Sequence, residues 1–171
     1  LVKYCEENNK TVGDAFKLVE NLFIESVISS NYDVTQKEEE IVIDKNSKEV
    51  DLFLQNPQNL SVWIKSLNEN KEILQLHNNT IYFKMNNEDY TLEVKSIPNN
   101  IQIRYLENQQ HKATFKITVQ NAKDLTLVKY QQIWDLGWNP IAKLFAQKTK
   151  EKSSIEIKKD LLALKRHLEN Q

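Results

Sequence analysis

The chain has 171 residues, of which 40% are hydrophobic and 27% are charged, as expected for a globular protein of one domain plus an appendage. Its 23 Lys and Arg residues nearly balance its 24 Asp and Glu residues, and the resulting net charge of −1 argues against a nucleic-acid binder, which normally carries a basic excess. The chain has only two glycines, so neither a phosphate-binding Walker loop nor a dinucleotide-binding fingerprint can be written.

Cys5 is the only cysteine, so one chain can form neither an internal disulfide nor a thiolate metal cluster. No apolar run approaches the ~20 residues that a membrane-spanning helix needs. These features favour a cytoplasmic protein. The sequence begins at Leu1 and not at Met, so a signal or anchor upstream would not be seen.

Residues 1–35 show a helical pattern, with Thr11 as a candidate N-cap. Apolar residues follow Thr11 at helical spacing: Ala15, Phe16, Val19, Leu22, Phe23 and Val27. We expect residues 1–35 to form a helical appendage and connector, and residues 36–171 to form the main domain. The apolar stripe needs a cover. We favour packing on the main domain, and the alternative is a neighbouring domain or partner.

The main domain is expected to begin with a polar connector up to residue 40 and a short strand at residues 41–43. Ser47 is a candidate cap for a short helix whose apolar side holds Val50, Leu52, Phe53 and Leu54. Asn56 and Pro57 end this helix. A second short helix is predicted from Leu60, Trp63, Ile64 and Leu67.

Six strands follow in the pattern, separated by two to five polar residues as in antiparallel hairpins. They are predicted at residues 72–76, 81–85, 90–97, 101–106, 111–120 and 124–134. The alternation is clearest at Ala113, Phe115, Ile117 and Val119, which we place on the inward face. Because glycine is so rare, we expect asparagine to supply most of the turn positions with positive φ.

One long helix is expected to close the chain, from Asn139 as cap and Pro140 as first residue to about Leu168. Its pattern changes phase near residues 149–154. One stripe contains Ile141, Leu144, Phe145, Ile155 and Leu162. The other, nearly opposite, contains Ile157, Leu161, Leu164 and Leu168.

This order of elements resembles the helix-grip fold of the START-like (SRPBCC) superfamily, which includes polyketide cyclases, the birch-pollen allergen group and lipid-transfer domains. Three stretches carry the resemblance: residues 40–63, residues 139–145 (NPIAKLF) and residues 161–169 (LLALKRHLE). The implied fold is α+β, with a curved antiparallel sheet of six to seven strands around the long C-terminal helix and an extra N-terminal helix.

The resemblance also implies a cavity between the sheet and the C-terminal helix that holds an apolar ligand such as a lipid, fatty acid or polyketide. We expect the ligand to contact inward aromatic and aliphatic side chains and the first half of the helix. These residues are Trp63, Phe83, Leu92, Val94, Tyr105, Phe115, Ile117, Val119, Ile141, Leu144 and Phe145. The second half of the helix is expected to pack as structural core.

No catalytic residue, metal site or cofactor is assigned from the sequence. His77, His111 and His167 lack the spacing of metal ligands and are expected at the surface. Tyr105, Lys129 and Gln131 are the polar side chains that we place on inward faces. A small apolar molecule is the expected partner, with no nucleic acid and no indicated membrane contact. The alternatives are a cyclase or dehydratase acting in the same cavity, and a protein-interaction domain.

Overall fold

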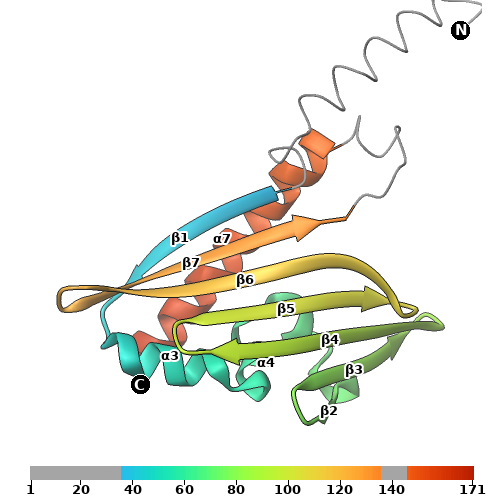
Figure 1. The fold of residues 1–171 in the computed structure, drawn as a ribbon, viewed down its shortest axis with the longest axis horizontal. Helices are drawn as coiled ribbons and strands as arrows, with labels where there is room; N and C mark the ends of the chain where they lie inside the picture. The colour runs from blue at the N-terminus through green and yellow to red at the C-terminus, as the bar shows by residue number, and fades with distance from the viewer. Residues whose placement is uncertain (1–35, 136–145) are drawn as a thin grey trace, which may run out of the picture.

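The computed structural model describes residues 36–135 and 146–171. Seven strands form one curved antiparallel sheet in the order β1-β7-β6-β5-β4-β3-β2 (Figure 1). The strands are β1 (Gln36–Ile43), β2 (Gln75–His77), β3 (Thr80–Met85), β4 (Glu88–Ile97), β5 (Asn100–Glu107), β6 (Gln110–Ala122) and β7 (Leu125–Trp134). Strands β2 to β7 form a meander, and β1 pairs with β7 at the far edge. The predicted α+β architecture is confirmed.

The hairpin turns use asparagine where other proteins use glycine. Positive φ values between 48° and 66° occur at seven residues that are not glycine: Asn78, Asn86, Asn87, Asn99, Asn108, Gln109 and Lys123. Asparagine tolerates the left-handed region because its short polar side chain can hydrogen-bond locally. The prediction that asparagine supplies most of these positions is therefore confirmed.

Two predictions about strand positions were wrong. The first strand was expected at residues 41–43, but β1 begins at Gln36, because the polar residues before Ile41 pair with β7 along the sheet edge. A strand was expected at residues 72–76, but Lys71–Ile73 form the 3₁₀ turn η2 and the strand begins at Gln75.

Short helices connect β1 to β2 on the concave side of the sheet. They are α3 (Ser47–Gln55), η1 (Pro57–Asn59), α4 (Leu60–Trp63) and α5 (Lys65–Asn68). The side chain of Asn46, and not the predicted Ser47, caps α3 by accepting from the Lys48 amide. Leu52 is 61% exposed and does not belong to the apolar side of α3, which buries Val50 and Leu54.

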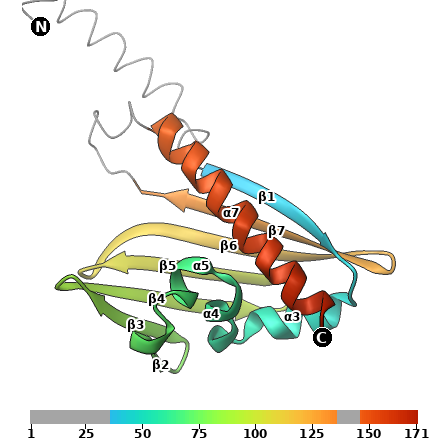
Figure 2. The same cartoon turned by 180° about the vertical axis from the view of Figure 1, so that it is seen from behind.

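The long helix α7 (Ala146–Glu169) crosses the concave face diagonally and ends beside α3 (Figure 2). Four residues at helical spacing are buried in the core: Ile157, Leu161, Leu164 and Leu168. This confirms that the second stripe is structural core. Ile155 and Leu162 lie on the exposed side of α7. The expectations for residues 1–35 and for the start of the helix at Asn139–Phe145 lie outside the described residues.

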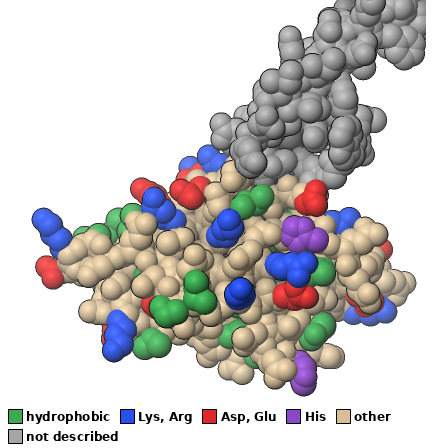
Figure 3. Space-filling model, in the orientation of Figure 1, with side chains coloured by type: hydrophobic (Ala, Val, Ile, Leu, Met, Phe, Trp, Pro, Cys, Tyr) green, Lys and Arg blue, Asp and Glu red, His purple; other side chains and the backbone are tan. Residues whose placement is uncertain are grey.

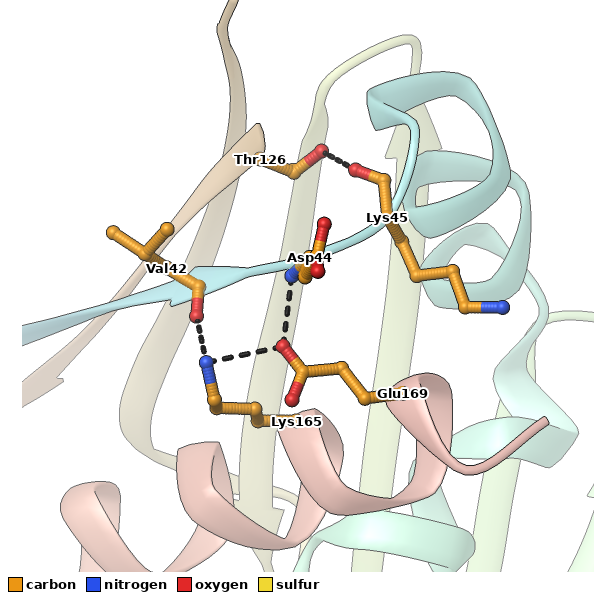
Figure 4. A network of polar contacts seen from close by, with 6 residues as sticks. All are labelled: Val42, Asp44, Lys45, Thr126, Lys165 and Glu169. Atoms are coloured by element: carbon orange, nitrogen blue, oxygen red, sulfur yellow. Dashed lines mark hydrogen bonds and ion pairs between the residues drawn. The ribbon is translucent and has the colours of Figure 1, made fainter. Parts of the chain in front are cut away.

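Polar contacts fix the C-terminal end of α7 to the end of β1 and to the link that follows it (Figure 4). The Lys165 ammonium donates to the Val42 carbonyl at 2.6 Å, and Glu169 Oε1 accepts from the Asp44 amide at 2.8 Å. Lys165 and Glu169 also form an ion pair at 3.0 Å. The Asp44 amide, followed by Lys165, lowers the pKa of Glu169. These bonds set the position of the helix along the sheet.

A second polar contact lies further towards the N-terminal end of α7. The Ser154 hydroxyl donates to Glu39 on β1 at 2.5 Å, and Lys37 and Lys158 lie 3.3 Å and 3.9 Å from the same carboxylate oxygen. Partial burial raises the pKa of Glu39, but the Ser154 hydroxyl and the two lysines outweigh it, so the pKa is lowered. Helix α7 is thus attached to β1 at two points along its length. In the described residues no helix is both long enough and apolar enough to cross a membrane.

Candidate functional site

The concave face of the sheet has a packed end and a hollow end. At the packed end, α3 and the last turns of α7 cover aliphatic side chains from the central strands. These side chains are Val94, Ile101, Ile117, Val119 and Val128. At the other end, the same strands line a cavity of about 470 Å³.

The cavity lies between the sheet, α5 and α7. Its floor is the inward face of β3 to β7, its cover is α5 with the segments on either side, and one wall is the middle of α7. Ile64 and Leu67 contribute apolar surface from the cover, and Leu92 and Ile103 contribute it from the floor. Its volume falls in the usual range for small-molecule pockets, roughly 300–1,000 Å³.

Aromatic side chains form most of the cavity floor. Phe83 and Tyr90 stack with ring centroids 4.9 Å apart, and Tyr105 continues the row at 6.2 Å from Tyr90. Phe115 stacks on Tyr105 at 6.1 Å, and Trp134 lies edge-on to both of these rings. Burial, followed by the charge of Glu107, raises the pKa of Tyr105 to about 12, so its hydroxyl stays protonated at neutral pH.

A chain of hydrogen bonds runs along β7 at the inner side of this floor. The Trp134 indole donates to Gln132 Oε1 at 3.2 Å, and Gln132 Nε2 donates to the Tyr130 hydroxyl at 3.2 Å. The three residues alternate along one strand and therefore share its inward face. Burial is the main cause that raises the pKa of Tyr130. Because its oxygen accepts from Gln132, the Tyr130 hydroxyl keeps its own proton for donation.

Asp160 of α7 is the most deeply buried ionisable side chain of the cavity wall, with 6% of its surface exposed. Its Oδ1 accepts from the backbone amide of Lys65 at 3.0 Å. Burial raises the pKa of Asp160 to about 6, and nearby Glu156 adds to this effect, although the Lys65 amide opposes it. A carboxylate in this place is partly protonated near neutral pH, unlike a surface aspartate.

The remaining charged groups of the cavity are exposed to solvent. Lys65 and Glu69 form an ion pair at 3.4 Å at the cover, while Glu156 and Lys159 lie on α7. These exposed charges are screened by water and salt far more than Asp160 is.

The eleven predicted ligand-binding residues fall into three groups. Phe83, Leu92, Tyr105 and Phe115 line the cavity. A second group is buried in the core but does not line the cavity: Trp63, Val94, Ile117 and Val119. The third group, Ile141, Leu144 and Phe145, lies outside the described residues.

Trp63 does not line the cavity but packs against one of the lining residues. It contacts Tyr130 edge-on with ring centroids 5.6 Å apart, and its indole nitrogen is buried without a hydrogen-bond partner among the described residues. The other three core residues occupy the packed end, where the helices leave no space above the strands.

The prediction that Lys129 and Gln131 point inward was wrong. Tyr130 and Gln132 occupy the inward face of β7, while Lys129 lies on the outer face and pairs with Glu40 at 3.8 Å. The strand sequence LTLVKYQQIW has apolar residues at both odd and even positions, so its own alternation does not fix the face. Pairing with β6 fixes it, because Ile117 is opposite Tyr130.

The predicted site did not contain five further residues of the cavity lining: Tyr90, Ile103, Tyr130, Gln132 and Asp160. The patterns of β4 and β5 contained Tyr90 and Ile103. A signal for Asp160 was also present, because it lies three residues after Ile157 and four before Leu164 and so shares their buried face. A carboxylate at a core position of an otherwise apolar stripe marks it as unusual.

The outer face of the sheet differs from the concave one. Figure 3 shows this face with charged side chains of both signs scattered among a few hydrophobic ones. Arg104 and Glu93 form one of its ion pairs at 2.7 Å. Within residues 36–135 and 151–171, no cluster of three or more His, Cys, Asp or Glu side chains could hold a metal ion.

No family model matches the chain, and a search of curated proteins finds no match. Solved structures do match. The Aha1 protein of Colwellia psychrerythraea is 17% identical with a TM-score of 0.54, over 78% of this chain and 96% of that one. CalU16 of Micromonospora echinospora is 11% identical with a TM-score of 0.51, over 78% and 73% of the two chains.

The di-domain ARO/CYC protein BexL of the BE-7585A biosynthetic pathway is 14% identical with a TM-score of 0.54, over 78% of this chain and 46% of that one. The fold is helix-grip. Identities this low support the fold of the chain and not its activity.

Proposed function

We propose that the protein binds a small hydrophobic ligand in the cavity between the sheet and helices α5 and α7. The observation that carries the proposal is the contrast within one sheet face: the packed end is filled with aliphatic side chains, and the hollow end keeps about 470 Å³. The cavity is open to solvent at its charged rim and mainly apolar on its floor, which is the usual form of a small-molecule site. An apolar ligand fits this arrangement.

The shape and chemistry of the floor favour a ligand with flat rings. A row of stacked aromatic side chains offers ring faces and edges to which planar molecules bind by offset stacking or edge contacts. This supports a polyketide-like ligand over a lipid or a fatty acid. One of the similar structures, the di-domain ARO/CYC protein BexL of a biosynthetic pathway, is consistent with that class.

The second candidate function is that of a cyclase or dehydratase. The polar residues that could support it differ from those predicted from the sequence. Of the three polar groups expected to converge, only Tyr105 lines the cavity, because Lys129 and Gln131 point outward. Tyr130, Gln132 and Asp160 lie around the cavity instead, and Tyr130 and Asp160 are near enough to interact electrostatically. A binding protein releases its ligand unchanged, whereas an enzyme returns a product of different mass or connectivity.

Native mass spectrometry of the freshly purified chain tests the proposal. We expect an adduct of a few hundred daltons, recoverable by organic extraction. Leu67→Phe, which adds volume to the cavity cover, should reduce the adduct. Leu60→Phe is the matched control, because Leu60 is a buried leucine of the neighbouring helix that does not line the cavity.

Two results would count against the proposal. One is the absence of any adduct together with failure of the chain to take up a neutral hydrophobic dye such as Nile red. The other is an equal reduction of uptake in the Leu67 and Leu60 variants at equal stability.

A further inference from the structure

Asp160 has one carboxylate oxygen available to a ligand. Its Oδ1 is held by the Lys65 amide at 3.0 Å, and no hydrogen bond to its Oδ2 is found among the described residues. The side chain is 6% exposed and belongs to the cavity wall. Oδ2 is not one of the fully buried polar atoms of the described residues that lack a partner, so it meets the open space of the cavity, where a donor on the ligand could bind it.

The charges around Asp160 leave the cavity acidic. Glu156 is on the same face of α7 one turn earlier, and it acts on Asp160 as a like charge. On α5, Lys65 offers its ammonium to Glu69 at 3.4 Å. Among the described residues Lys159 is the other cation of the lining, and its side chain is exposed. The described part of the lining therefore holds three carboxylates and two ammonium groups, and the Lys65 ammonium is already paired with Glu69.

The aromatic floor faces the same space. The faces of tryptophan, tyrosine and phenylalanine rings attract cations, most strongly where water is excluded. Phe115, Tyr105 and Trp134 line the cavity that Asp160 borders. An apolar pocket with aromatic walls and one buried carboxylate has the features that recognise an organic cation.

We propose that the ligand of this cavity is an apolar, ring-bearing molecule that carries a protonated amino group, which binds Asp160. This inference rests on the proposed function and narrows its ligand class. Free fatty acids and other carboxylates are disfavoured by the same geometry, because their head group would meet a like charge at Asp160, the buried carboxylate of the described lining. Neutral ring systems bind more weakly than amines, through the aromatic floor alone.

The elevated pKa of Asp160 supports this inference. Burial favours the protonated acid, and the fold retains a carboxylate here although an apolar residue would fit an apolar stripe better. Its hydrogen bond to the Lys65 amide uses one carboxylate oxygen, which an asparagine oxygen could replace, so this bond alone does not require the charge.

Three probes of one shape test the inference on the full chain: naphthylmethylamine, naphthylmethanol and naphthoate. Calorimetric titration at a pH of about 8 keeps Asp160 and naphthoate ionised and the amine protonated. We expect the amine to bind roughly tenfold or more tightly than the alcohol, with naphthoate weakest. Asp160→Asn keeps an oxygen for the Lys65 amide but removes the charge, so it should abolish the preference for the amine.

Asp51→Asn is the matched control. Asp51 is also a buried aspartate whose Oδ1 accepts from a backbone amide, that of Asn99 at 3.0 Å, but it does not line the cavity. The Asp51 variant should bind the three probes like the parent.

The outcomes separate the two proposals. If the alcohol or naphthoate binds as tightly as the amine, or if Asp160→Asn keeps the preference, the amine inference is overturned and the binding function stands. If none of the probes binds and Nile red does not bind either, the binding function itself fails.

Discussion

The two ends of the concave sheet face are built from the same strands but differ in side-chain class. On β5, Ile101 is fully buried at the packed end, whereas Ile103, two residues later on the same face, borders the cavity. On β6 the change falls between Ile117 and Phe115. The strand backbone is continuous across this boundary, so the helices and not the sheet decide where the hollow lies.

The two ends of the sheet face use different side-chain classes for different purposes. Branched aliphatic residues fill the space below α3 and the end of α7, where shape alone matters. Aromatic residues, with Tyr130 and Gln132 beside them, occupy the end where the cover is partial. The predictions below test whether the packed end provides stability and the hollow end provides binding.

The largest effect is expected at the packed end. Leu164 is fully buried on α7, and Leu164→Ala should lower the free energy of unfolding by about 2–5 kcal/mol, because it removes apolar contacts and leaves a void. Chemical denaturation measures the change. Binding of Nile red by the folded fraction should stay at the parent level, and loss of binding in a variant that is still folded would place the ligand near Leu164.

One turn earlier on the same helix, Asp160→Asn is expected to raise the free energy of unfolding and not to lower it. The pKa of Asp160 is about 6 in the folded protein against 3.8 in the unfolded chain, so folding favours the protonated acid. The contribution of Asp160 to the stability of the parent protein is therefore fully present below pH 3.8. This contribution is lost as the pH rises through about 6. Above this range Asp160→Asn should be more stable than the parent by about 3 kcal/mol.

Denaturation at several pH values tests this sign. The stability gain of Asp160→Asn should shrink towards zero as the pH falls from about 8 to about 4, because the parent becomes protonated. Taking the difference between the two proteins cancels contributions such as that of Glu39, whose lowered pKa works in the other direction. A gain that does not change with pH would mean that the charge of Asp160 is not its cause.

A smaller effect is expected in the hydrogen-bond chain of β7. Trp134→Phe removes the indole donor to Gln132, which should cost about 1 kcal/mol in stability. A double-mutant cycle with Gln132→Leu isolates this pair, and its coupling energy should also be about 1 kcal/mol. A coupling energy near zero would mean that the chain does not stiffen the cavity floor.

The sequence predicted the elements of the fold better than the site. Alternation along β6 placed its four inward residues correctly, and the phase of α7 identified Ile157, Leu161, Leu164 and Leu168 as core. Both patterns depend on local periodicity, which a single sequence displays. The asparagine-rich turns were likewise predictable, because few other residues adopt positive φ at low cost.

The boundary between the packed and hollow ends was not predictable in the same way. Val94 and Leu92 have the same period and similar chemistry, and only the path of α5 and α7 over the sheet distinguishes them. Which side chains of β7 face inward is decided by its pairing with β6, and not by the alternation of β7 itself. Asp160 was not part of the predicted site, although its helical phase places it on the buried face of α7.

The most direct test of a ligand-binding hollow end is the pair Ile101→Phe and Ile103→Phe. The two isoleucines share a strand, a face and near-complete burial, at 0% and 1% exposure, and only Ile103 borders the cavity. Ile101→Phe should cost roughly 1–3 kcal/mol from overpacking and leave Nile red affinity unchanged in the folded protein. Ile103→Phe can extend into the cavity, so it should cost less stability and weaken dye binding. Equal stability losses with unchanged binding in both variants would contradict the account.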